Sequence, residues 1–299
     1  MDYVRLGILG ASEGNGHPYS WSAIFNGYQP AAMSECGFPI ISTYLAKQLF
    51  PRDCIPRARV THVWTQEKSR SMHIAEATFI DKVVEEAEDM IGQVDAVLLA
   101  RDDCENHRQF AEPFIAAGLP IYIDKPLALS RKAAAEIFTL EMRPGQIFSC
   151  SALRFSREML LTPHQIKIIG GINHISAVVP NSWNKYAIHA IDPILKNCGS
   201  MGHIRNVRVH KFGSNGGGAI VSFDWGENQK LCEIKACGNE SSPIAVEYYG
   251  PKGVIKTRFS DSYAAFKSAL EVFVADSVLG RKSYCEDIMN SVEILELGA

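Results

Sequence analysis

Apolar and polar residues follow two patterns in the first half of the chain. Continuous apolar runs are typical of strands buried in a parallel sheet, whereas apolar residues that recur every third or fourth position are typical of helices. The apolar runs lie at 4–10, 60–65, 94–100, 119–123 and 146–153. Helical spacing or helix-start signals lie between them, at 19–25, 41–49, 71–77, 80–90, 107–117 and 131–140. Strands that alternate with helices in this way predict a doubly wound parallel sheet.

After Arg154 the pattern changes to short strands joined by turns. The strand-like segments are 172–180, 204–212, 218–224, 230–237, 244–249 and 253–258. Glycine and asparagine mark turns between them, including 213–216 and 226–228. Two helices are expected near the end, at 264–279 and 285–297. We therefore predict an α/β chain of two domains, with the parallel sheet in 1–150 and an α+β fold with a mostly antiparallel sheet in 151–299.

Composition excludes several classes of partner. The chain has 299 residues, 46% of them hydrophobic, and a formal net charge of −3, so nothing points to nucleic acid or to an anionic membrane surface. The first apolar run is too short for a signal peptide or a membrane span. The eight cysteines include no CxxC pair and no zinc-type cluster, so we expect reduced thiols, no metal site and a cytoplasmic location.

A polar stretch rich in glycine follows the first apolar run. A dinucleotide pyrophosphate needs backbone N–H groups at a helix N-terminus and no side chain in the way, and Gly10, Gly14 and Gly16 could meet this need. The spacing departs from G-x-G-x-x-G, because the second and third glycine positions are Ser12 and Asn15. The turn is thus either a dinucleotide site or a loop that binds nothing.

The end of the second predicted strand bears on the choice of dinucleotide. NAD enzymes place a carboxylate there for the ribose hydroxyls, but this chain has Thr65 followed by Gln66, with Arg70 close behind. A hydroxyl and a nearby cation suit a 2′-phosphate better, so the segment favours NADP over NAD. Glu67 could still reach a ribose, and a solvated turn is the other alternative.

Two further segments carry groups suited to proton transfer. Asp124-Lys125-Pro126 ends a strand, where open α/β sheets bind ligands, and a lysine there can hold or move a proton that a neighbouring carboxylate tunes. The proline is a candidate for a cis peptide bond. If 185–192 is helical, then Lys185, His189 and Asp192 lie on one face, and the histidine is a candidate general acid or base.

These segments resemble the Gfo/Idh/MocA family of oxidoreductases, which includes glucose-fructose oxidoreductase and inositol dehydrogenase. The resemblance covers nearly the whole chain. It rests on VDAVLLA at 94–100 with His107, on AGLPIYIDKPLA at 117–128, on ALRF at 152–155, and on His189 with Asp192.

The resemblance implies a Rossmann domain, a C-terminal sheet that forms a homodimer or homotetramer, and hydride transfer between NAD(P) and a carbon of a sugar or cyclitol. It implies that Lys125 and His189 are catalytic and that Asp192 binds the substrate or orients the histidine. It also implies that Arg101, Asp102, His107 and Asp124 lie beside the cofactor.

The chain departs from the family pattern in its charges. Arg101-Asp102-Asp103 replaces Thr-Pro-Asn, and Lys185 replaces an aspartate four residues before the histidine. Arg101, Arg154 and Lys185 together suggest an anionic substrate such as a sugar acid or nucleotide sugar.

Two interpretations of the function remain. In the first, the chain is an oxidoreductase of this family. The segment SEGNGHPYSWSAIFNGY at 12–28 is similar to a subgroup associated with surface-sugar biosynthesis. Alternatively, the chain is a non-catalytic regulator or scaffold that binds a dinucleotide or sugar on the same fold. The altered glycine spacing favours this alternative, whereas Lys125, His189 and Asp192 argue for an enzyme.

Overall fold

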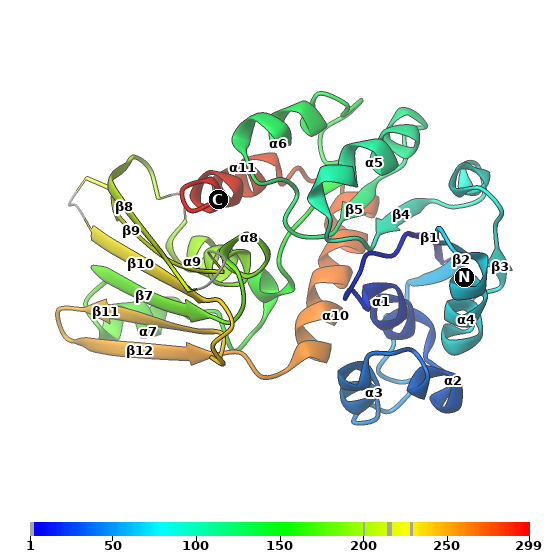
Figure 1. Cartoon of the computed structure of the whole chain (residues 1–299), viewed down its shortest axis with the longest axis horizontal. Coiled ribbons are helices and arrows are strands. Elements are labelled where there is room, and N and C mark those ends of the chain that lie inside the picture. The colour runs from blue at the N-terminus through cyan, green and yellow to red at the C-terminus, as the bar shows by residue number, and fades with distance from the viewer. Residues whose placement is uncertain (1–2, 200, 214–216, 228–229) are drawn as a thin grey trace. The chain divides into compact units, whose positions relative to one another are not determined.

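The computed structural model describes residues 3–199, 201–213, 217–227 and 230–299. Its contacts divide the chain into two compact units (Figure 1). The first comprises the residues up to 127 together with 135–149 and 261–285, and the second comprises 128–134, 150–260 and 286–299. This division differs from a single cut at 150, because the segment 261–285 packs with the first unit.

A six-stranded sheet forms the centre of the first unit. Its strand order is β3-β2-β1-β4-β5-β6, and all its strand pairs are parallel. The strands are β1 (Val4–Leu9), β2 (Ala58–Trp64), β3 (Lys82–Val83), β4 (Ala96–Leu99), β5 (Ile121–Ile123) and β6 (Ile147–Phe148). This is the strand order of the Rossmann fold, so the predicted doubly wound sheet is confirmed.

Helices cover both faces of this sheet, as parallel strands require. In Figure 1, α5 lies above the sheet, and α1 and α4 lie below it. The helices of this part of the chain are α1 (His17–Asn26), α2 (Pro30–Ser34), α3 (Pro39–Leu45), α4 (Lys68–Thr78), α5 (His107–Ala116), α6 (Arg131–Phe138) and α10 (Ser262–Val272). α10 continues as a π-helix over Phe273–Leu279.

Some predicted elements of this half were wrong. The helix predicted over 80–90 is instead the strand β3 followed by a 3₁₀ turn at Ala87–Met90. The side chains of Glu86 and Asp89 cap this turn reciprocally, and β3 pairs with β2, so the apolar residues serve a strand and a turn. The strand predicted over 146–153 ends at Phe148, and a 3₁₀ turn, Ala152–Phe155, follows Ser151.

The second unit contains a mostly antiparallel sheet, as predicted. Its order is β12-β11-β7-β10-β9-β8, and only the β7–β10 pair among these is parallel. The strands are β7 (His174–Val179), β8 (Ile204–Phe212), β9 (Gly218–Trp225), β10 (Lys230–Cys237), β11 (Ala245–Gly250) and β12 (Gly253–Arg258). The turns predicted at 213–216 and 226–228 include residues that lie outside the described part of the chain.

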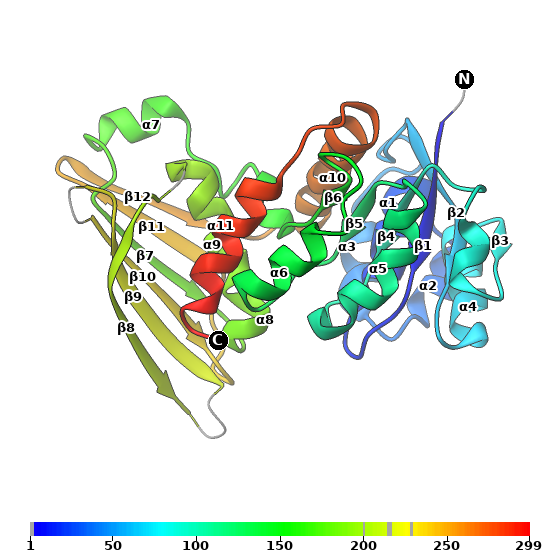
Figure 2. The ribbon, with the colours of Figure 1, turned by 90° about the horizontal axis from the view of Figure 1, so that it is seen from above.

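One face of this sheet packs on helices and forms the core of the second unit. Figure 2 shows α9 (Ile188–Cys198) and α11 (Cys285–Glu296) along that face. The other helices of this unit are α7 (Pro163–Ile168) and α8 (Trp183–Tyr186). Alternate residues of β10 point into the core, and Ile191 and Ile194 of α9 meet them there. Across the described ranges, no helix has the length and apolar character needed to cross a membrane.

Candidate functional site

The turn after β1 is the first part of the candidate site. Gly10 has a φ of 77° and Gly14 a φ of 76°, both in the left-handed region that favours glycine. A Cβ on Gly10 would lie 2.5 Å from Cδ of Arg101, whereas a Cβ on Gly14 would meet nothing within 4 Å. The strand order reverses between β1 and β4, which is where such sheets bind ligands.

The residues in place of the other two glycines direct their side chains to neighbouring strand ends. Ser12 Oγ donates to Asp102 at 2.6 Å and accepts the Asp102 N–H at 3.2 Å. Asn15 Nδ2 donates to Asp124 at 2.9 Å, and Asn15 Oδ1 accepts the N–H of His17 at 2.8 Å. Asp102 follows β4 and Asp124 follows β5. The turn is therefore held by side-chain hydrogen bonds that glycines could not make.

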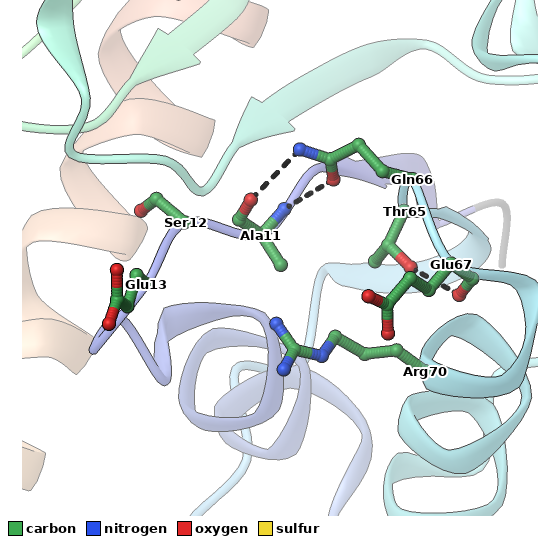
Figure 3. A pocket seen from close by; sticks show the side chains of 7 residues that line it. All are labelled: Ala11, Ser12, Glu13, Thr65, Gln66, Glu67 and Arg70. Atoms are coloured by element: carbon green, nitrogen blue, oxygen red, sulfur yellow. Dashed lines mark hydrogen bonds between the residues drawn. The ribbon is translucent and has the colours of Figure 1, made fainter.

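A pocket of about 230 Å³ opens beside this turn (Figure 3). It is lined by Ala11, Ser12, Glu13, Thr65, Gln66, Glu67 and Arg70. Gln66 pairs with the backbone of Ala11: its amide donates to the carbonyl at 3.0 Å and accepts the N–H at 3.2 Å. The pocket thus joins the turn after β1 to the end of β2, as a site for the adenosine half of a dinucleotide requires.

Side chains of different charge line the far wall of the pocket. In Figure 3 the guanidinium of Arg70 extends from α4 toward the turn, and the carboxylate of Glu67 lies on the same side. Thr65 is buried, and its hydroxyl donates to the carbonyl of Glu67 at 2.8 Å and lies 2.9 Å from Ser71 Oγ. Its hydroxyl is engaged within the protein, which leaves Arg70 as the better phosphate ligand of the predicted pair.

Arg101 follows β4 and is buried, but its charge is paired. Nε donates to Asp103 at 2.9 Å, and Nη2 donates to the second carboxylate oxygen. The guanidinium lies 4.4 Å from the centre of the Phe110 ring. Burial raises the pKa of Asp103, but Arg101 and Asn106 outweigh it and lower the pKa overall. Arg101 therefore shapes the loop and does not present an unpaired cation to an anionic substrate.

His107 is also part of the scaffold. Its ring is fully buried, with Nε2 2.7 Å from the carbonyl oxygen of Arg101 and Nδ1 3.0 Å from that of Leu127. These carbonyls belong to the loops after β4 and β5. The ring of His107 therefore ties these two loops together, and its place beside the cofactor stays a prediction.

Asp124 and Lys125 follow β5. Asp124 is 1% exposed, and its carboxylate accepts from Asn15, from Lys125 N–H at 2.7 Å and from His17 Nδ1 at 2.5 Å. Burial by itself raises the pKa of Asp124, but His17, Lys125 and Asn15 outweigh it and hold the pKa well below its usual range. The Lys125–Pro126 bond is cis, as predicted.

The second unit holds the predicted histidine and its neighbours. His189 Nδ1 lies 2.8 Å from the Oγ of Ser151, and the backbone N–H of Ser151 donates to Asp192 at 2.6 Å. Asp192 is buried and also accepts from Ser291 Oγ. Burial raises the pKa of Asp192, although Arg154, Ser291 and Ser151 act in the opposite direction. Asp192 therefore reaches the histidine through Ser151.

Arg154 was predicted to bind an anionic substrate, but its charge is paired inside the second unit. It is buried, with Nη1 3.5 Å from Asp192 and Nη2 bonded to Asp287. Two carboxylates surround one guanidinium, so the cation that supported an anionic substrate is already balanced.

Lys185, His189 and Asp192 do not share one environment. α8 ends at Tyr186 and α9 begins at Ile188, so Lys185 lies on a different helix from the other two residues. Lys185 is exposed, His189 is half-buried and Asp192 is buried. The prediction that these three residues form a single functional face is therefore corrected, because their exposure to solvent falls from Lys185 through His189 to Asp192.

Three contributors were not predicted from the sequence. Ser151, Asp287 and Ser291 complete the network around His189, Asp192 and Arg154. They lie 38 to 133 positions from their partners, so only the fold reveals them. A local signal exists for Ser151 alone, because it follows an apolar run and caps the next turn.

The residues of the first unit fit a dinucleotide in several respects. The turn contains two left-handed glycines, of which Gly14 leaves open space beside it, α1 begins after it, and a pocket joins the turn to the end of β2. Gly10 is required because Arg101 fills the space that a Cβ would need. Gly10, Gly14, Gln66 and Arg70 are thus placed to hold such a cofactor.

Comparison with protein families gives one match. Residues 38–151 match the Gfo/Idh/MocA family, described as "Oxidoreductase family, NAD-binding Rossmann fold". The matched segment contains Asp124 and Lys125 and begins after the altered turn. No curated protein matches the sequence.

Solved structures share the fold of nearly the whole chain. A scyllo-inositol dehydrogenase from Lactobacillus casei, with bound NAD(H) and scyllo-inositol, has a TM-score of 0.73 at 14% identity and covers 99% of this chain and 96% of its own. A myo-inositol dehydrogenase from the same organism, in complex with NAD(H) and myo-inositol, has a TM-score of 0.74 at 11% identity, with coverages of 99% and 93%. A probable dehydrogenase from Thermotoga maritima has a TM-score of 0.72 at 14% identity, with coverages of 98% and 94%.

At these identities the solved structures establish the fold, and the family match covers residues 38–151. The resemblance found in the sequence is confirmed over residues 38–151, which match the Gfo/Idh/MocA family of oxidoreductases.

Proposed function

We propose that this protein is an NAD(P)-dependent dehydrogenase or reductase that acts on a CH–OH group of a cyclitol or sugar. The observation that carries the proposal is Asp124-Lys125 at the carboxyl end of β5, within the segment that matches the family. Similar folds bind NAD(H) with an inositol, which supports this class of substrate.

We propose Gly10, Ser12, Gly14, Asn15, Gln66 and Arg70 as the residues that hold the cofactor. The nicotinamide supplies the hydride acceptor or donor when the dinucleotide is bound. Arg70 points into the pocket, and no aspartate lines it, which supports NADP over NAD. Glu67 is the residue that favours NAD instead, since its carboxylate lines the same pocket.

Proton transfer is assigned to Lys125 and His189. In the oxidation direction the amine of Lys125 or the imidazole of His189 takes the proton of the substrate hydroxyl as its carbon loses a hydride. Ser151 fixes the histidine ring, and Asp192 fixes Ser151 through its backbone N–H. Asp192 is then a positioning residue, since its oxygens already accept from Ser151 and Ser291.

We propose an uncharged polyhydroxyl substrate in place of the anionic one expected from the sequence. The sequence suggested an anionic substrate because of Arg101, Arg154 and Lys185. Arg101 and Arg154 are buried and have carboxylate partners, and only Lys185 of these three is exposed. A role in surface-polysaccharide synthesis and a cytoplasmic location stay predictions.

A homodimer or homotetramer through the C-terminal sheet is also proposed. On the face of this sheet away from the core, Leu231, His174, Tyr249 and Val254 are successive neighbours across four strands. Leu231 and Val254 are each at least 40% exposed, and His174 stacks on Tyr249 at 5.0 Å. Such an apolar row supports self-association. Light scattering of the wild type and of the Leu231→Lys variant tests this interface. An equal molecular mass for the two proteins would contradict it.

The proposed activity is tested by incubating the protein with NAD⁺ or NADP⁺ and a panel of polyols. The panel contains myo-inositol, scyllo-inositol, glucose and gluconate, and reduced nicotinamide is followed by absorbance. Lys125→Ala is expected to lower turnover by about a hundredfold or more, with little change in dinucleotide affinity. Turnover that survives this change would contradict the role of Lys125.

The alternative function is a dinucleotide-binding regulator without catalysis. It is favoured by the carboxylates of Asp102 and Asp124, which lie against a turn where a pyrophosphate would bind. Tight dinucleotide binding with no turnover on any substrate of the panel would support it. Absence of dinucleotide binding would exclude the dehydrogenase and leave a regulator or scaffold that binds a sugar.

A further inference from the structure

The carboxylate of Asp124 joins three segments of the first unit. Oδ2 accepts from Asn15 Nδ2 at 2.9 Å and contacts His17 Nδ1 at 2.5 Å, and Oδ1 accepts the backbone N–H of Lys125 at 2.7 Å. Asp124 is almost fully buried, so its charge depends on these partners for stabilisation. An amide at this position would turn one acceptor toward a donor and leave that donor unsatisfied.

The ring of His17 is fixed by aromatic neighbours. It stacks on Trp21 with centroids 5.0 Å apart and an interplanar angle of 13°, and Phe266 meets it edge-on at 5.0 Å. Trp21 stacks in turn on Tyr122 at 4.8 Å. Tyr122 lies in β5, two positions before Asp124, so His17 and Asp124 are fixed on one packed scaffold.

The negative charge of Asp124 interacts with both His17 and Lys125. Both groups stabilise the charged form of this carboxylate. The backbone N–H of Lys125 donates to this carboxylate at 2.7 Å, so a displacement of Asp124 after loss of the His17 donor also moves Lys125.

We infer that His17 and Asn15 are positioning residues for Lys125 and act on it through Asp124. The two residues occupy the altered part of the glycine-rich turn, so this turn and the proposed catalytic lysine form one hydrogen-bonded unit. The inference rests on the proposed function, in which Lys125 takes the hydroxyl proton. It explains why Asn15 stands at the third glycine position of G-x-G-x-x-G: its side chain donates a hydrogen bond to Asp124.

The test measures the acetylation rate of Lys125 by acetic anhydride at fixed pH, read by peptide mass spectrometry. His17→Phe keeps a stacking ring and removes the donor, and Asn15→Ala removes the amide. Both are expected to change the acetylation rate of Lys125 by about threefold or more, because Lys125 is 9% exposed and its position depends on the hydrogen bond to Asp124. Lys82, on the exposed edge strand β3, is the internal reference and should keep its rate.

Ser12→Ala is the matched control, because it removes a hydrogen bond of the same turn that goes to Asp102 and not to Asp124. Thermal unfolding of each variant verifies that it is folded. An unchanged Lys125 rate in His17→Phe, or an equal change in Ser12→Ala, would overturn the inference. The measurement needs neither substrate nor cofactor, so it is independent of whether Lys125→Ala abolishes turnover.

Discussion

Ser151 Oγ lies 2.8 Å from Nδ1 of His189, and it connects this histidine to the buried network around Asp192. The backbone N–H of Ser151 donates to Asp192, which stands three positions after His189 on α9. The two residues of the helix are thus joined by a residue outside it. A histidine fixed at one nitrogen by an oriented group is arranged as an acid or base would be.

Ser151→Ala should reduce turnover more than it reduces binding. A neutral hydrogen bond contributes about 1 kcal/mol, so kcat should fall about fivefold when the ring of His189 loses its partner. Dinucleotide affinity should stay unchanged. Steady-state kinetics on a substrate found in the polyol panel measures kcat and KM separately.

Ser291→Ala is the matched control for Ser151→Ala. It removes a hydroxyl donor from Asp192 and leaves the bond between Ser151 and His189 in place. Its kcat should fall less than that of Ser151→Ala. Equal losses in the two variants would mean that Ser151 matters only for the buried network.

Arg70→Ala should separate the two dinucleotides. The guanidinium lines the pocket beside the turn, and a charge-assisted bond to a 2′-phosphate contributes about 2 kcal/mol. Affinity for NADPH should therefore fall about thirtyfold, while affinity for NADH stays close to wild type. Fluorescence titration of the reduced nicotinamide measures both.

Lys68→Ala serves as the control on the same helix, because Lys68 pairs with Glu85 and does not line the pocket. It should leave both affinities unchanged. If Arg70→Ala weakens NADH and NADPH equally, the preference for NADP is wrong, and Glu67 becomes the residue that determines the cofactor.

Gly10→Ala and Gly14→Ala should differ in stability although their backbone angles match. Both glycines have φ near 76°, so each substitution costs about 1 kcal/mol in backbone strain. Only the new methyl at position 10 meets Arg101, at 2.5 Å from Cδ, and this overpacking adds about 1–3 kcal/mol. Urea unfolding measures the difference.

A third substitution, Arg101→Ala, tests whether the Arg101 side chain causes this difference in stability. Arg101→Ala removes the side-chain atoms that the methyl at position 10 would meet, so the double variant should recover the extra loss of Gly10→Ala. Equal losses in the two single variants would show that the Arg101 side chain moves away at no cost.

The sequence predicted most strands of the two sheets because buried strands leave a local signal of consecutive or alternating apolar residues. Each buried run after a turn became a strand, including the central β1. The exception, 80–90, has apolar residues at helical spacing, but Glu86 and Asp89 cap a 3₁₀ turn there and β3 pairs with β2. Periodicity alone cannot distinguish these outcomes when a segment is short.

The chemistry of the site was harder to predict because charges find partners that the sequence does not reveal. Arg154 appeared available to a substrate, yet Asp287, 133 positions away, pairs with it. Arg101 has its partner two positions on, at Asp103, but only the structure shows that the guanidinium turns toward it. The altered positions Ser12 and Asn15 were recognised as departures, and their hydrogen bonds to Asp102 and Asp124 supply the reason.

Asp124→Asn should destabilise the protein at neutral pH, and this loss of stability relative to the wild type should shrink as the pH falls. The folded protein holds the pKa of Asp124 below its unfolded value near 3.9, so the ionised carboxylate stabilises the fold above that pH. This contribution is lost as the pH falls from the unfolded value through the folded one. At about pH 7 the variant should be less stable by about 3 kcal/mol, because the donors of Asn15 and His17 lose a charged partner. Urea unfolding of both proteins from about pH 7 to about pH 3 should show the difference shrinking at the acidic end. A difference that stays constant over this range would mean that folding does not shift the pKa of Asp124, and that its partners in the fold do not stabilise its charge.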